Sequence, residues 1–182
     1  TEEELGNSVT PLMQMEINTG NALPIKQNAR RIPPPYRKEV DAYLDDLLKR
    51  GKIRESHSPW ASPLVIVLKK DKSLRVCVDM RALNEVTVKD AISLPRVQDC
   101  LEALSGSKVF SVLDARSGYH QIGLTESSKP KTAFVTPHRG QYEFTCVPFG
   151  VTNDVGQFVR LMNLALHGTL WKDCLAYIDD LI

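Results

Sequence analysis

Residues 64–79 read LVIVLKKDKSLRVCVD, and this stretch decides how the first half of the chain folds. Its opening, Leu64 to Leu68, is an apolar run rich in β-branched side chains, which is typical of a buried strand. A polar turn follows at 69–73, and polar and apolar side chains then alternate from Leu74 to Asp79. Alternation with a period of two indicates a strand with one covered face. The stretch therefore predicts a β-hairpin.

Three other segments carry apolar residues at helical spacing. The first begins at Tyr36 and ends at Gly51, with a stripe at Val40, Tyr43, Leu44, Leu47 and Leu48. The second covers 94–104 and places Val97, Leu101 and Leu104 on one face. The third begins near Thr152, and its stripe is Phe158, Leu161, Met162, Ala165 and Leu166.

Four more short runs predict strands, at 109–113, 132–136, 142–147 and 174–178, with a turn at 138–140 between the middle two. Together the elements give the α+β class, with helices packed on antiparallel strands. Residues 1–34 show no helical or strand period and run into three prolines at 33–35. We expect them to form an arm or linker without a core of its own.

The composition of the 182 residues, 42% hydrophobic and 25% charged with a net charge of +1, is ordinary for a globular protein. No apolar run reaches the roughly 18 residues of a membrane helix, so we expect no membrane association. The four cysteines form no CxxC pair, which argues against a zinc site and favours a reducing, intracellular setting. The acidic, polar start argues against a secretory signal, and the lack of an initiating Met predicts that the chain was cut from a longer protein.

Acidic residues follow two of the predicted strands. Asp114 ends the strand at 109–113, and Asp179 and Asp180 follow the strand at 174–178. If the two strands are neighbours, three carboxylates converge, an arrangement that suits two Mg²⁺ ions and phosphoryl transfer. Asp-Asp pairs are also common on surfaces, as expected for Asp45-Asp46, so this pattern alone leaves both readings open.

Five boxes in order give the chain a family resemblance from about Leu23 to its last residue. They are SPWASP at 58–63, RVCVDMRALN at 75–84, LDARSGYHQI at 113–122, VPFGVTN at 147–153 and YIDD at 177–180. They resemble the reverse transcriptase of Ty3/gypsy-type long-terminal-repeat retrotransposons. The resemblance implies a right-hand polymerase fold, with fingers at about 35–93 and 123–150 and part of the palm at about 94–122 and 151–182, without a thumb.

The resemblance also implies an RNA-directed DNA polymerase that transfers nucleotides from dNTPs to a primer 3′-hydroxyl on an RNA or DNA template. In such enzymes the residues matching Asp114, Asp179 and Asp180 bind two Mg²⁺ ions, which Mn²⁺ can replace. The positions that match nucleotide-binding residues are Lys69, Arg75, Ala115, Tyr119 and Gln121, with Tyr119 as the aromatic that excludes a 2′-hydroxyl. Those that match the template contact and pocket wall are Arg81, Phe149, Gly150 and Tyr177.

The remaining expectations concern context. Partners implied by the resemblance are primer–template, dNTPs and the rest of a Pol polyprotein: thumb, RNase H, protease and integrase. The life cycle of such retrotransposons implies that the protein acts inside the cell, in a cytoplasmic virus-like particle. The boxes and Tyr119 argue against an RNA-copying RNA polymerase.

Two departures from the family pattern leave an alternative open. After Asn153 the family reads APATFQ, whereas this chain reads DVGQFV, and we expect Asp154 either to repel template phosphate or to cap a helix. Gly156 weakens a helix by up to about 1 kcal/mol relative to Ala. The chain also stops two residues after Asp180, so we expect the hairpin to lack its return strand and the fragment alone to be inactive. The alternative is a catalytically inactive relic that at most binds nucleic acid.

Overall fold

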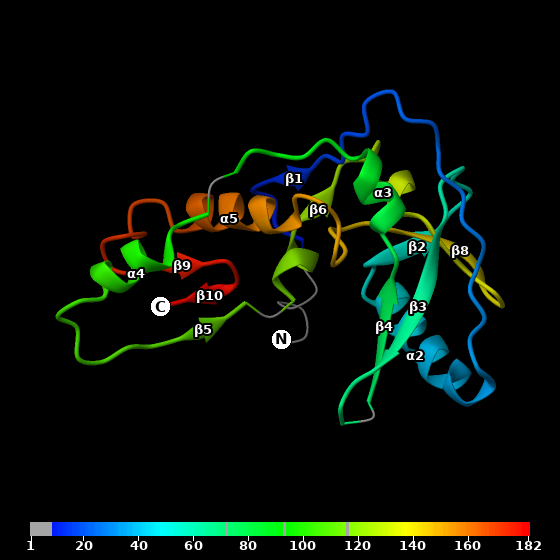
Figure 1. Cartoon of the computed structure of the whole chain (residues 1–182), viewed down its shortest axis with the longest axis horizontal. Coiled ribbons are helices and arrows are strands. Elements are labelled where there is room, and N and C mark those ends of the chain that lie inside the picture. The colour runs from blue at the N-terminus through cyan, green and yellow to red at the C-terminus, as the bar shows by residue number, and fades with distance from the viewer. Residues whose placement is uncertain (1–8, 72, 93, 116) are drawn as a thin grey trace.

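The computed structural model describes residues 9–71, 73–92, 94–115 and 117–182. A five-stranded sheet, in the order β2-β8-β7-β3-β4, and a three-stranded sheet, β5-β10-β9, lie at opposite ends of the molecule, with the β1-β6 pair between them (Figure 1). The helices pack on these sheets, which confirms the α+β class. Among the described residues, no helix is both long and apolar enough to cross a bilayer.

The described elements follow one another along the chain as short pieces. They are β1 (Gln14–Met15), η1 (Pro34–Tyr36), α2 (Arg37–Lys49), β2 (Ile53–Glu55), β3 (Ser62–Leu68), β4 (Leu74–Val78), α3 (Arg81–Val86), α4 (Val97–Ala103), β5 (Leu113–Asp114), η2 (Gly118–Gln121), β6 (Gly123–Leu124), η3 (Lys129–Thr132), β7 (Phe134–Thr136), β8 (Gly140–Phe144), α5 (Asp154–Ala165), β9 (Ala176–Tyr177) and β10 (Asp180–Leu181).

The predicted hairpin is confirmed as β3–β4. It is antiparallel from Leu64 opposite Val78 to Leu68 opposite Leu74. β3 also runs parallel to β7, with Ser62 opposite Phe134, so the sheet is mixed and not antiparallel throughout. A parallel neighbour needs a long crossover, which the chain between β3 and β7 supplies and which local sequence does not reveal.

Helix α2 buries the predicted stripe against the five-stranded sheet. Val40, Leu44 and Leu47 are each 1% exposed, and Tyr43 and Leu48 pack on the same core. Its C-terminal turn carries Lys49 beside the negative end of the helix dipole. This segment was predictable because a helix stripe is set by local spacing.

The segment predicted as an arm contributes to the core. Met15 and Ile17 are fully buried, and β1 runs parallel to β6. The Ile17 N–H donates to Ser128 Oγ at 2.8 Å, and Lys131 Nζ donates to the Ile17 carbonyl at 2.6 Å. In Figure 1 the same segment continues over the top of the molecule and down beside β3. The segment without a strand period therefore contains the two-residue strand β1 and packs into the common core, while the proposed arm and domain bounds stay a prediction.

Two predicted elements near the three-stranded sheet are shorter than expected. Helix α4 covers only Val97–Ala103, and Val97 and Leu101 are 55% and 59% exposed, so the predicted stripe is not buried. The strand predicted at 109–113 is reduced to Leu113–Asp114. Its partner β10 lies opposite only these two residues, and a strand exists only where another strand pairs with it.

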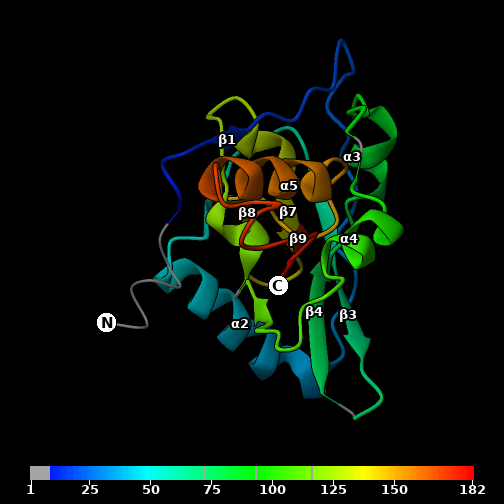
Figure 2. The ribbon, with the colours of Figure 1, turned by 90° about the vertical axis from the view of Figure 1, so that its left-hand side faces the viewer.

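Helix α5 begins two residues later than predicted and crosses the molecule between the sheets. It packs on η2 and on β9, and Figure 2 shows β9 beside the helix. Phe158 and Leu161 of its predicted stripe are buried, whereas Ala165 is exposed. The helix therefore connects the segment that carries Tyr119 with the hairpin that carries the acidic pair.

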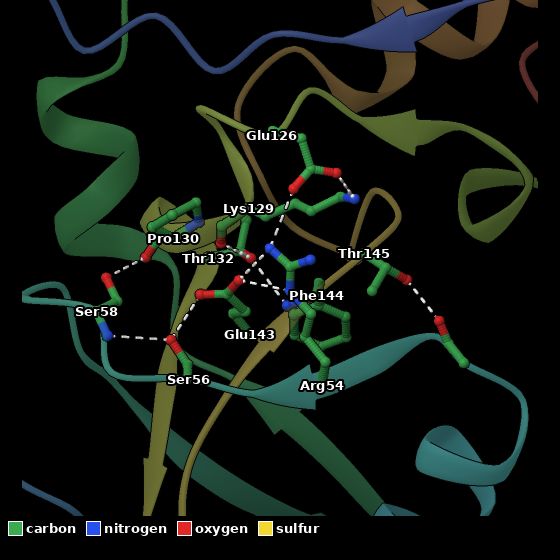
Figure 3. A network of polar contacts seen from close by, with 11 residues as sticks. Arg54, Ser56, Ser58, Glu126, Lys129, Pro130, Thr132, Glu143, Phe144 and Thr145 are labelled. Atoms are coloured by element: carbon green, nitrogen blue, oxygen red, sulfur yellow. Dashed lines mark hydrogen bonds and ion pairs between the residues drawn. The ribbon is translucent and has the colours of Figure 1, made fainter.

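A charge network around the buried Glu143 ties β2 to β8 (Figure 3). Glu143 is 5% exposed and accepts hydrogen bonds from Ser56 Oγ at 2.6 Å and Arg54 Nε at 2.8 Å. Arg54 also contacts Glu126, which pairs with Lys129. The buried carboxylate thus has the partners that compensate its desolvation.

Candidate functional site

The three acidic residues singled out by the sequence meet at the three-stranded sheet. Asp180 stands opposite Asp114 in the antiparallel β5–β10 pair, and the Ala115 N–H donates to the Asp179 carbonyl at 3.3 Å. Residues directly opposite in such a pair project to the same face, with Cβ atoms roughly 5 Å apart. The register therefore brings Asp114 and Asp180 side by side, with Asp179 in the adjoining turn.

The turn between β9 and β10 is tight and strained. Tyr177 pairs with Asp180, which leaves Ile178 and Asp179 as the two turn residues. Ile178 has φ +57°, a conformation that is rare and costly for a β-branched side chain. β10 itself is the return strand, so the expectation that the hairpin lacks one is wrong: two residues after the turn suffice to pair with both neighbours.

The acidic site is open to solvent. Asp114, Asp179 and Asp180 are all exposed, and opposed carboxylates repel each other. Their oxygen donors are the ligands that a hard divalent cation prefers. Within the described ranges, however, no three His, Cys, Asp or Glu side chains are grouped closely enough to hold a metal ion. The backbone thus brings three suitable donors together, while their carboxylates are not gathered into a finished ligand set.

Tyr119 lies on η2, beside the acidic residues. It is 9% exposed and packs edge-on against Phe149, with 5.5 Å between the ring centroids. Its ring is tilted against that of Phe158, with 5.3 Å between the centroids. Burial raises the pKa of Tyr119, and the charges of Asp179 and Asp154 raise it further. The phenol therefore stays protonated, within electrostatic reach of the acidic hairpin.

The turn before Tyr119 depends on close contact with α5. A Cβ added at Gly118 would lie 2.7 Å from the Phe158 ring, closer than carbon atoms approach, so only glycine fits there. Ser117, directly before it, has φ +52°. The glycine of the third box is thus explained by packing of η2 on the helix.

Beneath η2 lies a buried lysine that the sequence gave no reason to select. Lys52 is 1% exposed, and its Nζ donates to the His120 carbonyl at 2.9 Å. Burial lowers the pKa of His120 to about 4, and the nearby positive charge of Lys52 contributes. A neutral imidazole therefore sits against Phe149, with 5.0 Å between the ring centroids.

The predicted phosphate-binding cations line a cavity between α2 and the β3–β4 hairpin. A cavity of about 460 Å³ is bounded by Lys69, Arg75 and Phe149, with Glu39, Tyr43, Leu74 and Val76 completing the wall. A second cavity of about 250 Å³ shares Arg75 and Phe149 and reaches inward to His120. Lys69 and Arg75 thus line the same cavity as the Phe149 ring.

The other predicted site residues, Arg81, Tyr177 and Gln121, do not line the two cavities. Arg81 is bound through two of its nitrogen atoms to Asp79, at 2.8 and 2.7 Å, and Arg30 bonds the same carboxylate. Hydrogen bonds from Arg81 lower the pKa of Asp79 to about 2. Tyr177 is half-buried in β9. Gln121 ends η2, where its carbonyl accepts the Thr10 N–H at 2.7 Å, and it lines neither cavity.

Two asparagines that received no role from sequence organise the loops around the site. Asn84 Nδ2 donates to the Gly150 carbonyl at 2.8 Å, and its Oδ1 accepts the Thr152 N–H at 2.7 Å. Asn153 bonds the Val88 carbonyl and the Asp90 N–H, both at 2.9 Å. Asn153 adopts φ +76°, a left-handed conformation that asparagine tolerates better than most residues, but the sequence does not show which asparagine adopts it.

The divergent segment 154–159 is well integrated. A Cβ on Gly156 would lie 2.6 Å from Ile92 Cγ2, so the glycine makes room for that side chain. Gln157 and Arg160 both bond Asp90 Oδ2, at 3.3 and 2.5 Å. The expected capping by Asp154 is wrong in detail: it is the first residue of α5, and its carboxylate accepts the N–H groups of Val155 and Gly150.

Comparison with known proteins agrees with this arrangement. The family model described as "Reverse transcriptase (RNA-dependent DNA polymerase)" matches residues 67–182. The Pol polyprotein of transposon opus from Drosophila melanogaster is 41% identical over 97% of the chain, which spans 18% of that polyprotein. An RNA-directed DNA polymerase homolog from Oenothera berteroana is 43% identical over 60% of the chain and 77% of its own length.

Among solved structures, the foamy viral protease-reverse transcriptase in complex with an RNA/DNA hybrid superposes with a TM-score of 0.77 at 25% identity. The match covers 92% of this chain and 22% of the viral one. Members of the matched family generally depend on divalent metal ions. By its boxes, its fold and these matches, the chain belongs to the reverse transcriptase family.

Proposed function

We propose that this chain forms the nucleotide-adding part of an RNA-directed DNA polymerase within a Pol polyprotein. The observation that carries the proposal is the register of β5 and β10, which sets Asp114 opposite Asp180 beside the turn residue Asp179. Carboxylates from two strands at one point are what phosphoryl transfer with divalent ions requires. Their solvent exposure leaves them accessible to a substrate.

Asp114, Asp179 and Asp180 are the residues that would hold the metal, two Mg²⁺ ions with Mn²⁺ as a replacement. When bound, the ions neutralise negative charge on the triphosphate and on the attacking and leaving oxygens. The primer 3′-hydroxyl attacks the α-phosphorus, the bond from that phosphorus to the bridging oxygen breaks, and pyrophosphate leaves. The role of the protein is mainly to position the reactants.

The chain's own side chains would orient the incoming nucleotide. Lys69 and Arg75 face the cavity of about 460 Å³, and their charges suit a triphosphate, with the guanidinium able to bond two oxygens at once. Tyr119 stands between that cavity's Phe149 wall and the acidic hairpin, where a bulky ring would clash with a ribose 2′-hydroxyl. Ala115 and Gln121 flank this aromatic in the chain and complete the proposed nucleotide set.

The proposed partners follow from the same site. Single template bases would pass the Gly150 turn, which Asn84 holds, and the Arg81–Asp79 pair, which follows β4. Primer–template, dNTPs and the rest of the polyprotein, including thumb, RNase H, protease and integrase, are the partners, and the site of action is a cytoplasmic virus-like particle. The foamy viral relative bound to an RNA/DNA hybrid supports the choice of nucleic acid.

A chimera tests the proposal: this chain replaces the matched segment of the opus Pol polyprotein, and primer extension on an RNA template is measured with Mg²⁺. We expect extension that Asp179→Asn abolishes, because one metal donor is lost. Asp173→Asn, an exposed acid in the same part of the chain, is the matched control and retains activity. A folded chimera that binds primer–template but adds no nucleotide would instead identify an inactive relic.

A further inference from the structure

The Gly150 turn is held from both sides by side chains of two helices. Its N–H donates to Asp154 Oδ2 of α5 at 3.1 Å, and its carbonyl accepts Asn84 Nδ2 of α3 at 2.8 Å. Gly150 itself has φ +82°, a conformation that only glycine adopts readily. Both hydrogen-bonding groups of one strained residue are therefore fixed by side chains from elsewhere in the fold.

The position of Gly150 decides where Phe149 lies. Phe149 precedes it, lines both cavities, and packs on Tyr119 and His120 at 5.5 and 5.0 Å between ring centroids. Phe149 is nevertheless 50% exposed, so its other face is not fixed by packing. The ring is thus held by the turn and by its two aromatic neighbours, and a shift of the turn moves the wall against which Tyr119 rests.

Asp154 is an unusual residue to hold this turn. Its side chain is partly buried, and within the described part of the chain it forms no ion pair. Burial raises its pKa, the N–H groups of Val155 and Gly150 counteract this, and the charge of Asp179 raises it again. A carboxylate kept in such surroundings costs stability, which only its two N–H donors offset.

We propose that Asp154 is a positioning residue which, through the Gly150 N–H and the Phe149 ring, fixes Tyr119 for discrimination between deoxyribo- and ribonucleotides. This inference rests on the proposed function. It gives the divergent segment a role in substrate selection, since the family pattern has alanine, which cannot accept a hydrogen bond, where this chain has Asp154.

The experiment compares Asp154→Ala with Asp154→Asn in the opus chimera. The alanine removes both acceptors, whereas the asparagine keeps one acceptor oxygen of similar shape. We expect Asp154→Ala to lower the ratio of kcat/KM for dNTP over rNTP roughly tenfold, the equivalent of one charge-assisted hydrogen bond. Asp154→Asn should lower that ratio by less than about threefold, because a neutral hydrogen bond to Gly150 is still available.

The matched control is Asp99→Ala, which also removes an acid from the first turn of a helix, α4, but an exposed one. It should leave the dNTP/rNTP ratio unchanged. A merely structural role for Asp154 would reduce the use of both nucleotides equally and leave the ratio constant, and that result would overturn the inference. A drop in kcat with an unchanged ratio would overturn it as well.

Failure of the proposed function gives a separate signal. If the wild-type chimera adds no nucleotide, the polymerase proposal fails, and Asp154 is judged in the 182-residue chain by NMR. Nuclear Overhauser contacts between the Tyr119 and Phe149 rings and slow exchange of the Gly150 amide should be lost in Asp154→Ala and kept in Asp99→Ala. Their retention in Asp154→Ala would overturn the positioning role.

Discussion

Asp114 and Asp180 face each other across the β5–β10 pair, so two like charges occupy a cross-strand position that normally holds attracting side chains. The conflict costs a few tenths of a kcal/mol, up to about 1 kcal/mol, in the absence of a cation. A site that is destabilising when empty and stabilised by binding is typical of a functional position.

Replacing one of the two acids should therefore stabilise the chain without metal. We expect Asp180→Asn to raise the free energy of unfolding by a few tenths of a kcal/mol in EDTA, because the cross-strand repulsion is removed. The same variant should lose most of the stabilisation that Mg²⁺ gives the wild type. Urea unfolding with and without Mg²⁺, at matched ionic strength, measures both effects. Equal Mg²⁺ stabilisation in wild type and variant would contradict the assignment of this pair.

His120 should make stability depend on pH. Its pKa in the folded chain is about 4, against 6.5 in the unfolded chain, so between these values the unfolded state binds a proton that the folded state does not. The contribution of the neutral His120 to the free energy of unfolding is therefore complete above pH 6.5. It falls by about 3 kcal/mol as the pH drops from 6.5 to 4. Asp79, with a pKa of about 2, loses its contribution only below this range.

Urea unfolding at several pH values, in wild type and His120→Phe, isolates that contribution. The variant should lose less stability than the wild type between pH 7 and pH 4, because it has no imidazole to protonate. His138→Gln, which changes an exposed histidine in the turn before β8, is the control. Parallel pH curves for wild type and His120→Phe would show that the buried imidazole is not responsible.

Gly156 and Ile92 should be energetically coupled. Gly156→Ala gains up to about 1 kcal/mol of helix propensity, but its new methyl group would overlap Ile92 Cγ2, and overpacking costs about 1–3 kcal/mol. In an Ile92→Ala background the same change should become neutral or stabilising. A double-mutant cycle by chemical denaturation gives the coupling, with exposed Asn163→Ala on α5 reporting the propensity gain alone. Additive effects would mean that the helix simply shifts away.

The buried Glu143 should contribute more than its exposed neighbour in the same network. Glu143→Gln leaves Arg54 and Ser56 competing for a single neutral acceptor, and we expect a loss of about 1–3 kcal/mol in unfolding free energy. Glu126→Gln, whose side chain is 74% exposed, should cost clearly less, because solvent screens its ion pairs. Thermal or urea unfolding checks the order, and similar losses for both would contradict the buried role.

Sequence predicted the elements whose signals are local. The α2 stripe and the β3–β4 hairpin follow from spacing and from the polar turn between strands, and both are found. Strand 109–113 was not predictable in length, because a strand's extent depends on its partner, here the two residues of β10. The burial of Met15 and Ile17 depends on docking against β6, which leaves no periodic signal.

The candidate site shows the same division. Asp114, Asp179 and Asp180 could be selected from their boxes, and the fold brings them together. The groups that hold the neighbouring loops could not be selected from sequence. Lys52 and Asn84 bond backbone atoms of residues far away in the chain, and such contacts have no sequence pattern. Asp154 stood out in the sequence as a departure from the family pattern. Only the structure shows that its carboxylate, at the start of α5, bonds the Gly150 N–H four residues before it.

The extended residues 109–112 have a consequence for handling the protein. Val109, Phe110 and Val112 are 88%, 49% and 64% exposed, and in the described part of the chain this stretch forms no backbone hydrogen bonds. Free N–H and C=O groups between β-prone apolar side chains are a template for intermolecular cross-β growth. Concentrated preparations should therefore lose soluble protein through fibril nucleation at residues 109–112. The substitution Val109→Lys should slow this loss.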